Sequence, residues 1–187
     1  MPRMATAKSE KNLVWIDCEM TGLDPARDRL LEIATIITNY DLEIVARGPV
    51  FVIRQSDERL RNMDAWNRRT HGASGLIDRV RSEGVSTAEA ERQTLAFIRR
   101  YCYKKKSPLC GNSIGQDRSF LSRYMPDLNE FLNYRVIDVS SIKLLAANWY
   151  AGKYKPPQKP ETHRALDDIE ESIAELAYYR KHVFVAD

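Results

Sequence analysis

The chain has 187 residues, of which 43% are hydrophobic and 29% charged, so it can bury one sizeable core and is not a low-complexity or disordered chain. Its net charge of +3 is too small to indicate a long basic track for nucleic acid, because the phosphates along such a track need many Lys or Arg partners. We expect a flexible tail over residues 1–10, a single domain over residues 11–187, and a short ligand if that ligand is a nucleic acid.

The first third of the domain is predicted to form strands. Residues 12–18 and 30–38 are rich in β-branched and apolar side chains, with turn-forming residues between them. Residues 43–54 continue the same pattern, with a break at a Gly-Pro step. These segments predict an antiparallel meander.

Helical periodicity begins near Ser56 and is clearest after Ser86. Ser86 with Glu89 three residues later is the pattern of a capping box, which marks a helix start. Four residues can form the buried side of this helix: Leu95, Phe97, Ile98 and Tyr101.

Strand and helix patterns then alternate. Residues 108–112 and 135–140 resemble strands, and residues 116–125 and 140–150 resemble helices. This order is typical of β-α-β-α units with parallel pairing. Together with the meander, it predicts an α/β fold in which a mixed sheet is flanked by helices.

A proline-rich loop precedes the last predicted helix. Residues 151–162 contain three prolines and cannot form a regular helix or a central strand. Residues 163–182 carry apolar side chains at spacings of three and four, so one face of this helix is expected to pack inward.

The compartment can also be inferred from the sequence. The first eleven residues lack the apolar core of a secretory signal, and no segment approaches the roughly 20 apolar residues of a membrane helix. Cys18, Cys102 and Cys110 form neither an even set nor a C-x-x-C pair, as expected of buried, reduced thiols. We expect a cytoplasmic protein without membrane contact.

Two acids interrupt the first predicted strand. Asp17 and Glu19 are two residues apart, so their side chains project from the same side of a strand. Two nearby carboxylates repel each other unless a cation compensates, and oxygen ligands suit Mg²⁺ or Mn²⁺. A turn-capping Asp beside an exposed Glu would explain the same pair if it stood alone.

Further acids follow in the chain. Asp117 opens a predicted helix, where the helix dipole alone would also stabilise a carboxylate. Asp168 lies on the last predicted helix, five residues after His163. Five residues subtend about 140° on a helix, so both side chains can meet one site only if His163 belongs to the loop or to a frayed first turn.

The chain carries a D-x-E strand, then a helix that begins with an Asp, and finally an H-x4-D motif. This order resembles the DEDD exonucleases of the ribonuclease H-like fold, in the subgroup whose fifth motif residue is a His. The segments "WIDCEMTGLDP", "MDAWNRRTHGASGL", "CGNSIGQDRSFL" and "YRVIDVSS" are similar to the oligoribonuclease family. This resemblance covers roughly residues 11–183. It implies a 3′-to-5′ exoribonuclease that hydrolyses short single-stranded RNA, especially linear 5′-phosphorylated dinucleotides, to nucleoside 5′-monophosphates.

The resemblance also implies roles for the acids and the histidine. Asp17, Glu19, Asp117 and Asp168 would hold two divalent cations, Mg²⁺ or Mn²⁺, about 3.5 to 4 Å apart. His163 would act as the general base, because its unperturbed pKa lies near neutrality.

Substrate contacts follow from the same resemblance. Leu23 would insert between the two bases, with Trp66 beside it, although either side chain could instead belong to the turn or the core. Four residues would cap the 5′ phosphate: His71, Ser113, Arg135 and Ser140. A helix-capping role for Ser140 and a surface ion pair for Arg135 are the simpler alternatives.

A homodimer is implied as well, in which Tyr134 reaches the site of the other subunit, whereas the residue alone could equally be part of the core. The competing functions are a DEDD exonuclease that acts on longer RNA or DNA and a catalytically silent nucleic-acid binding module. The modest net charge favours a short substrate over a long strand, and the five filled catalytic positions argue against a silent module.

Overall fold

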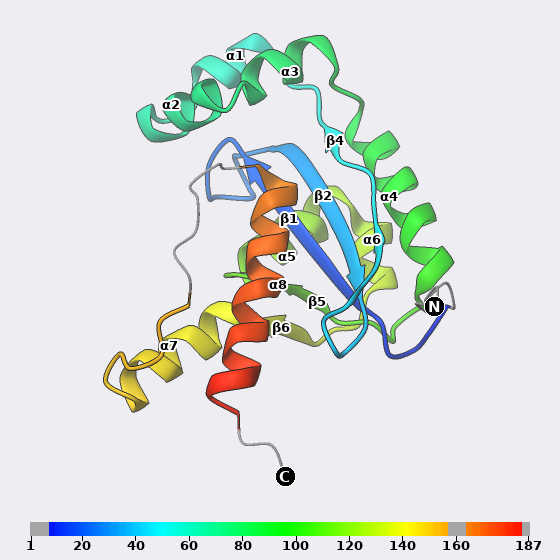
Figure 1. Cartoon of the computed structure of the whole chain (residues 1–187). Coiled ribbons are helices and arrows are strands. Elements are labelled where there is room, and N and C mark those ends of the chain that lie inside the picture. The colour runs from blue at the N-terminus through cyan, green and yellow to red at the C-terminus, as the bar shows by residue number, and fades with distance from the viewer. Residues whose placement is uncertain (1–7, 157–163, 185–187) are drawn as a thin grey trace.

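The computed structural model describes residues 8–156 and 164–184 and contains one mixed sheet with helices on both faces (Figure 1). The strands are β1 (Leu13–Met20), β2 (Leu30–Thr38), β3 (Ile44–Arg47), β4 (Phe51–Val52), β5 (Leu109–Gly111) and β6 (Val136–Asp138). Their order is β3-β2-β1-β5-β6, and β4 also pairs with β2. Pairing is antiparallel among β1 to β4 and parallel from β1 through β5 to β6. The predicted meander and β-α-β-α units are both confirmed.

The helices are α1 (Asp57–Arg61), α2 (Ala65–Ala73), α3 (Leu76–Ser82), α4 (Thr87–Tyr101), α5 (Gly115–Tyr124), α6 (Pro126–Phe131), α7 (Val139–Trp149) and α8 (Ala165–His182). Figure 1 shows α8 crossing one face of the sheet, α4, α5 and α6 covering the other, and α1 to α3 beyond one end. None of the helices within the described residues is both long and apolar enough to cross a membrane.

Side-chain alternation along β1 divides the core in two. Leu13 and Trp15 pack in the cluster formed with α7 and α8, whereas Val14, Ile16 and Cys18 pack in the cluster formed with α4, α5 and α6. Since successive side chains of a strand point to opposite faces, Asp17 and Glu19 continue the row of Trp15 toward α8. Cys18, which packs in the other cluster, therefore faces away from the two acids.

The predicted start of α4 is also confirmed. Ser86 is the N-cap of α4, and its side chain accepts a hydrogen bond from the Glu89 N–H at 3.2 Å. Leu95, Phe97 and Ile98 are buried along its inner side. The free cysteines are all buried, as their spacing predicted.

One segment differs from its sequence pattern. The run over residues 43–54 divides into two strands, β3 and β4. Gly48 lies between these strands, and its N–H donates to the Thr35 carbonyl. A side chain at Gly48 would lie 2.7 Å from the Phe97 ring, so the close approach of this loop requires glycine.

Two predicted segments, the proline-rich loop and the N-terminal tail, lie only partly within the residues that the structure describes. Residues 151–156 form neither helix nor strand, and the rest of the proline-rich segment lies outside the described residues. Near the N-terminus, the Ser9 N–H donates to the Tyr101 carbonyl at 3.0 Å. Ser9, which lies before the expected start of the domain at residue 11, is therefore bonded to the end of α4.

Candidate active site

Three carboxylates from two elements converge beside the sheet. Asp17 and Glu19 extend from β1, and Asp168 lies in the first turn of α8. One oxygen from each of the three side chains lies within 4.8 Å of the others. This brings together residues separated by about 150 positions in the chain, as the D-x-E and H-x4-D motifs predicted.

Asp117 approaches the same place from α5. Its side chain is only 6% exposed, and its Oδ1 accepts a hydrogen bond from the Cys18 N–H at 2.9 Å. Because Cys18 lies between Asp17 and Glu19, this bond fixes Asp117 against the acidic segment of β1. The role of Asp117 is therefore more specific than a favourable position at a helix N-terminus.

The crowding of these acids changes their proton affinity. Burial, reinforced by the carboxylates of Asp117 and Glu19, raises the pKa of Asp17 well above its ordinary value. Burial, with Asp168 as the next contributor, raises the pKa of Glu19 to about 8. Burial also raises the pKa of Asp117 to about 7, although the Cys18 N–H opposes this effect.

Raised pKa values mean that the site lacks compensating positive charge. A hard divalent cation with oxygen ligands would supply that charge, and the available donors are carboxylate oxygens. The residues present therefore fit Mg²⁺ or Mn²⁺, which is the class of cation that the sequence predicted.

His71 from α2 borders this acidic cluster. Its ring is 2% exposed, and Nδ1 lies 3.8 Å from Glu19 Oε2. Nε2 lies 2.9 Å from the Met20 carbonyl, which can only accept, so Nε2 carries the hydrogen. The structure therefore places His71 beside Glu19, at the edge of the acidic cluster.

Ser113 and Ser140 do come together. Their hydroxyl oxygens are 3.2 Å apart, and the Ser113 N–H donates to both Ser140 Oγ and Asp138 Oδ1 at 3.0 Å. Ser113 also adopts a left-handed backbone conformation, with φ of 49°, which is uncommon for a residue with a side chain. The alternative of Ser140 as a helix cap is wrong, because Asp138 is the N-cap of α7.

Arg135 and Tyr134 lie at the other end of β6. Arg135 immediately precedes this strand, while Ser140 follows its end. The Arg135 guanidinium carbon is 4.9 Å from the centre of the Tyr134 ring. The Tyr134 side chain is 75% exposed, which excludes a core role for it within the single chain.

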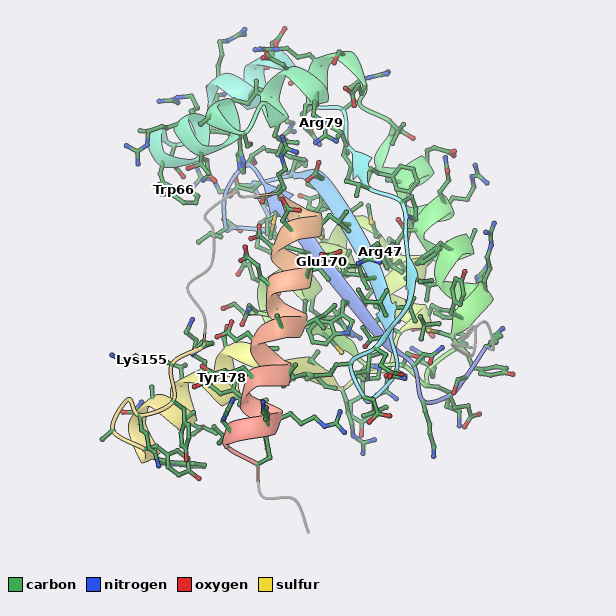
Figure 2. The ribbon with its side chains drawn as sticks, in the orientation of Figure 1. Arg47, Trp66, Arg79, Lys155, Glu170 and Tyr178 are labelled. Carbon is green, nitrogen blue, oxygen red and sulfur yellow. The ribbon has the colours of Figure 1, made fainter. Side chains whose placement is uncertain are left out.

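The two apolar residues predicted to contact bases are both on the surface. Leu23 is 75% exposed and Trp66 is 54% exposed, so neither belongs to the core. Leu23 is held through its carbonyl, which accepts from Gln116 Nε2 at 2.5 Å. Figure 2 shows Trp66 extending from α2. His163, the predicted general base, lies outside the described residues.

Sequence reasoning missed one acid near this site. Glu32 on β2 pairs directly with Glu19 on β1 and is 3% exposed. It is the single charged residue in the segment "LLEIATIIT", which otherwise reads as an apolar strand. A charge inside such a run is the signal that could have identified it.

Comparisons with known proteins agree with this geometry. A family model described as "Exonuclease" matches residues 14–176. A protein named oligoribonuclease from Paracidovorax citrulli is 56% identical over 95% of this chain and 92% of its own length. Proteins of the same name from Ectopseudomonas mendocina and Escherichia coli O157:H7 are 55% and 54% identical, over 96% and 93% of this chain and 99% and 96% of their own lengths.

Solved structures support the fold. The zinc-bound form of an E. coli ExoI–ssDNA complex matches with a TM-score of 0.75 at 14% identity, over 94% of this chain and 41% of that chain. Exonuclease I from Methylocaldum szegediense matches with a TM-score of 0.69 at 16% identity, over 92% of this chain and 41% of that chain. The chain therefore spans less than half of these exonucleases and shares with them a ribonuclease H-like fold.

Proposed function

This chain belongs to the oligoribonuclease family and is a 3′-to-5′ exoribonuclease, and we propose that it hydrolyses short oligoribonucleotides, above all 5′-phosphorylated dinucleotides. The observation that carries this proposal is the convergence of Asp17, Glu19 and Asp168, with Asp117 bound to the strand between the first two. A set of four partly or fully buried carboxylates has little use in a binding module, because each uncompensated charge is costly to remove from water.

The four acids would hold two divalent cations, Mg²⁺ or Mn²⁺. When bound, such a pair lowers the pKa of an attacking water and stabilises the departing oxygen of a phosphodiester. The contribution of the chain itself is to fix the acids on β1, α5 and α8, so that their oxygens need little rearrangement.

His163 is the proposed general base. It immediately precedes Arg164, the N-cap of the helix that carries Asp168. We expect His163→Ala to lower turnover by at least about a hundredfold, the usual contribution of a positioned base, while Mn²⁺ binding is retained. Turnover at the wild-type level would remove His163 from the mechanism.

The substrate contacts are proposed from exposure and position. Leu23 and Trp66 are large apolar side chains on the surface, as expected of groups that contact the bases of a substrate. Ser113 and Ser140 offer adjacent hydroxyls for a terminal phosphate. His71 is proposed to contact the substrate beside Glu19.

Tyr134 is proposed to reach the site of the partner subunit in a homodimer, and Arg135 is proposed to contact the 5′ phosphate together with Ser113, Ser140 and His71. Tyr134 and Arg135 both lie at the amino end of β6, which is an edge strand of the sheet. Five exposed apolar residues lie on this strand or on α7 and the residue after it: Val136, Leu144, Leu145, Trp149 and Tyr150. A patch of this kind is typical of an interface, and a second copy of the chain is the proposed occupant.

A cytoplasmic location is proposed from the buried, unpaired thiols.

The decisive experiment measures how cleavage depends on RNA length. We would compare 5′-phosphorylated RNA of two, three, five and twenty nucleotides with Mn²⁺ or Mg²⁺, using Asp168→Asn as the inactive control. Fast cleavage of the dinucleotide and slow loss of longer chains are expected. Efficient shortening of the twenty-nucleotide RNA would instead support an exonuclease of longer strands, and cleavage that does not require a cation would contradict the proposed metal site.

A further inference from the structure

Glu32 is a buried acid beside the metal-binding carboxylates that has no role in the mechanism above. It lies directly opposite Glu19 in the antiparallel pair of β1 and β2, so both side chains project from the same face of the sheet. With 3% of its surface exposed, Glu32 adds another carboxyl group to the region where Asp17, Glu19 and Asp168 already meet. A buried carboxylate in this position requires specific partners.

Both oxygens of Glu32 have such partners. Arg79 Nη1 donates to Oε1 at 2.7 Å, and the Ala165 N–H donates to Oε2 at 3.3 Å. Figure 2 shows Arg79 between α3 and the sheet. Glu32 is not part of the group of carboxylate oxygens that lie within 4.8 Å of one another, which comes from Asp17, Glu19 and Asp168.

The contact with Ala165 places a carboxylate at the start of α8. Ala165 is the first residue of this helix, and the N-cap residue Arg164 makes no side-chain capping hydrogen bond. The first N–H groups of a helix need acceptors from outside it, and negative charge is favoured there by the helix dipole. Glu32 therefore caps α8 from the neighbouring strand.

This cap acts on the turn that carries Asp168. Asp168 is three residues after Ala165, and its N–H donates to the Arg164 carbonyl at 3.0 Å. The same carboxylate therefore connects three elements: β2, which pairs with the strand of Asp17 and Glu19; α8, which carries Asp168; and α3, which supplies Arg79.

We propose that Glu32, held by Arg79, is a positioning residue that sets the start of α8 against the sheet and thereby keeps Asp168 in register with Asp17 and Glu19. This inference rests on the proposed metal site. It assigns to a residue outside the DEDD motif the task of organising two parts of that motif. Asp17 and Glu19 are fixed by their own strand, whereas Asp168 depends on where its helix begins.

The first test is Glu32→Gln in the full chain, since Gln keeps the size of Glu and removes its charge. For a 5′-phosphorylated RNA dinucleotide we expect kcat to fall about tenfold or more while KM stays within about twofold, because a displaced Asp168 would weaken the metal site more than the binding of the substrate. Isothermal titration of Mn²⁺ into the RNA-free protein should show a Kd raised about tenfold. Arg79→Met should act in the same direction.

The Glu32→Gln/Arg79→Met double variant measures the connection between the two residues. If Arg79 acts through Glu32, the losses in Mn²⁺ affinity will not add, and the double variant will resemble the more impaired single variant. Losses that add fully would mean that Arg79 acts independently and would overturn its place in the proposal.

Two surface ion pairs on the same helices provide matched controls. Glu170 on α8 pairs with Arg47 at 2.9 Å, and Arg81 on α3 pairs with Asp57 at 2.8 Å. The first of these pairs is labelled in Figure 2. Glu170→Gln and Arg81→Met remove comparable pairs that are exposed to solvent, so both variants should keep the wild-type kcat and Mn²⁺ affinity.

The outcomes separate this inference from the proposed function. A kcat and a Mn²⁺ Kd within about twofold of wild type for Glu32→Gln, with or without a lower melting temperature, would overturn the positioning role. If Asp168→Asn remains active, the proposed metal site itself fails; if it is inactive while Glu32→Gln is normal, only the positioning inference fails. Should Glu32→Gln not fold, Arg79→Met removes the partner of Glu32 instead, and an unchanged Mn²⁺ Kd in that variant would overturn the proposal.

Discussion

Two neighbouring aspartates on α8 allow the metal-site role of one residue to be separated from general charge effects. Asp168 belongs to the carboxylate cluster, whereas Asp167 is exposed on the same turn. Asp168→Asn should lower kcat for RNA dinucleotides by at least about a thousandfold, or about 4 kcal/mol in transition-state stabilisation, since it removes a ligand from the reacting centre. Asp167→Asn is the matched control and should stay within about threefold of wild type. Equal losses in the two variants would argue against a specific role for Asp168.

The raised pKa values of the acids predict an unusual dependence of stability on pH. Glu19 has a pKa of about 8 and Asp117 a pKa of about 7 in the folded protein, both well above their ordinary values. The folded protein therefore holds protons that the unfolded chain has already released. The free energy of unfolding consequently falls as pH rises from the unfolded pKa toward the folded pKa.

We expect the cation-free protein to lose roughly 6 kcal/mol of stability between about pH 5 and pH 8, because the shift of Glu19 acts over about three pH units of this range and that of Asp117 over about two, at about 1.4 kcal/mol per unit. Urea denaturation at several pH values, with a chelator present, measures this loss. Glu19→Gln should show a smaller loss, because it removes one titrating group and one repulsive charge. Saturating Mn²⁺ should also reduce it, and stability that rises with pH in the chelated wild type would contradict the prediction.

At the scale of single elements, α4 offers a test of stability that leaves the active site intact. Its N-cap, Ser86, accepts from the Glu89 N–H, and its buried side packs on the face of the sheet opposite α8. Ser86→Ala should lower the free energy of unfolding by about 1 kcal/mol and leave kcat unchanged. Ser141→Ala, an exposed substitution within α7, should not destabilise the protein in the same denaturation experiment. An unchanged stability in Ser86→Ala would show that the cap contributes little.

The elements also show what the sequence could and could not predict. Residues 30–38 formed the predicted strand without change of bounds, because β-branched residues dominate it and turn formers flank it. Asp17 and Glu19 were predicted to share a face from strand alternation alone. In contrast, the role of Glu32 depends on Arg79, which is 47 positions later, and on the start of α8, which is 133 positions later. Neither contact leaves a local periodic signal.

At the scale of the whole molecule, the chain order of the motifs predicted which acids would meet, but not where the predicted phosphate contacts would lie. His71 lies beside Glu19, while Ser113 and Ser140 meet beyond the ends of β5 and β6. Arg135 lies at the amino end of β6. These positions depend on strand direction and crossover, which residue types alone do not specify.

A mixing experiment tests whether Tyr134 acts across subunits. Tyr134→Ala retains all four acids but lacks the exposed ring, and Asp168→Asn retains the ring but lacks one acid. Each variant alone should be nearly inactive. If Tyr134 completes the partner's site, a mixed dimer contains one site with all four acids and a Tyr134 from the other chain.

Random exchange of equal amounts would make about half of the dimers mixed, each with one complete site, so activity should recover to about a quarter of the wild-type level. Trp149→Glu in both chains provides the control, because a charge in the exposed apolar patch of α7 should prevent association and abolish the recovery. Sedimentation would confirm a monomer in that case. If the mixed sample stays as inactive as its components while sedimentation shows exchanged dimers, Tyr134 acts within its own subunit.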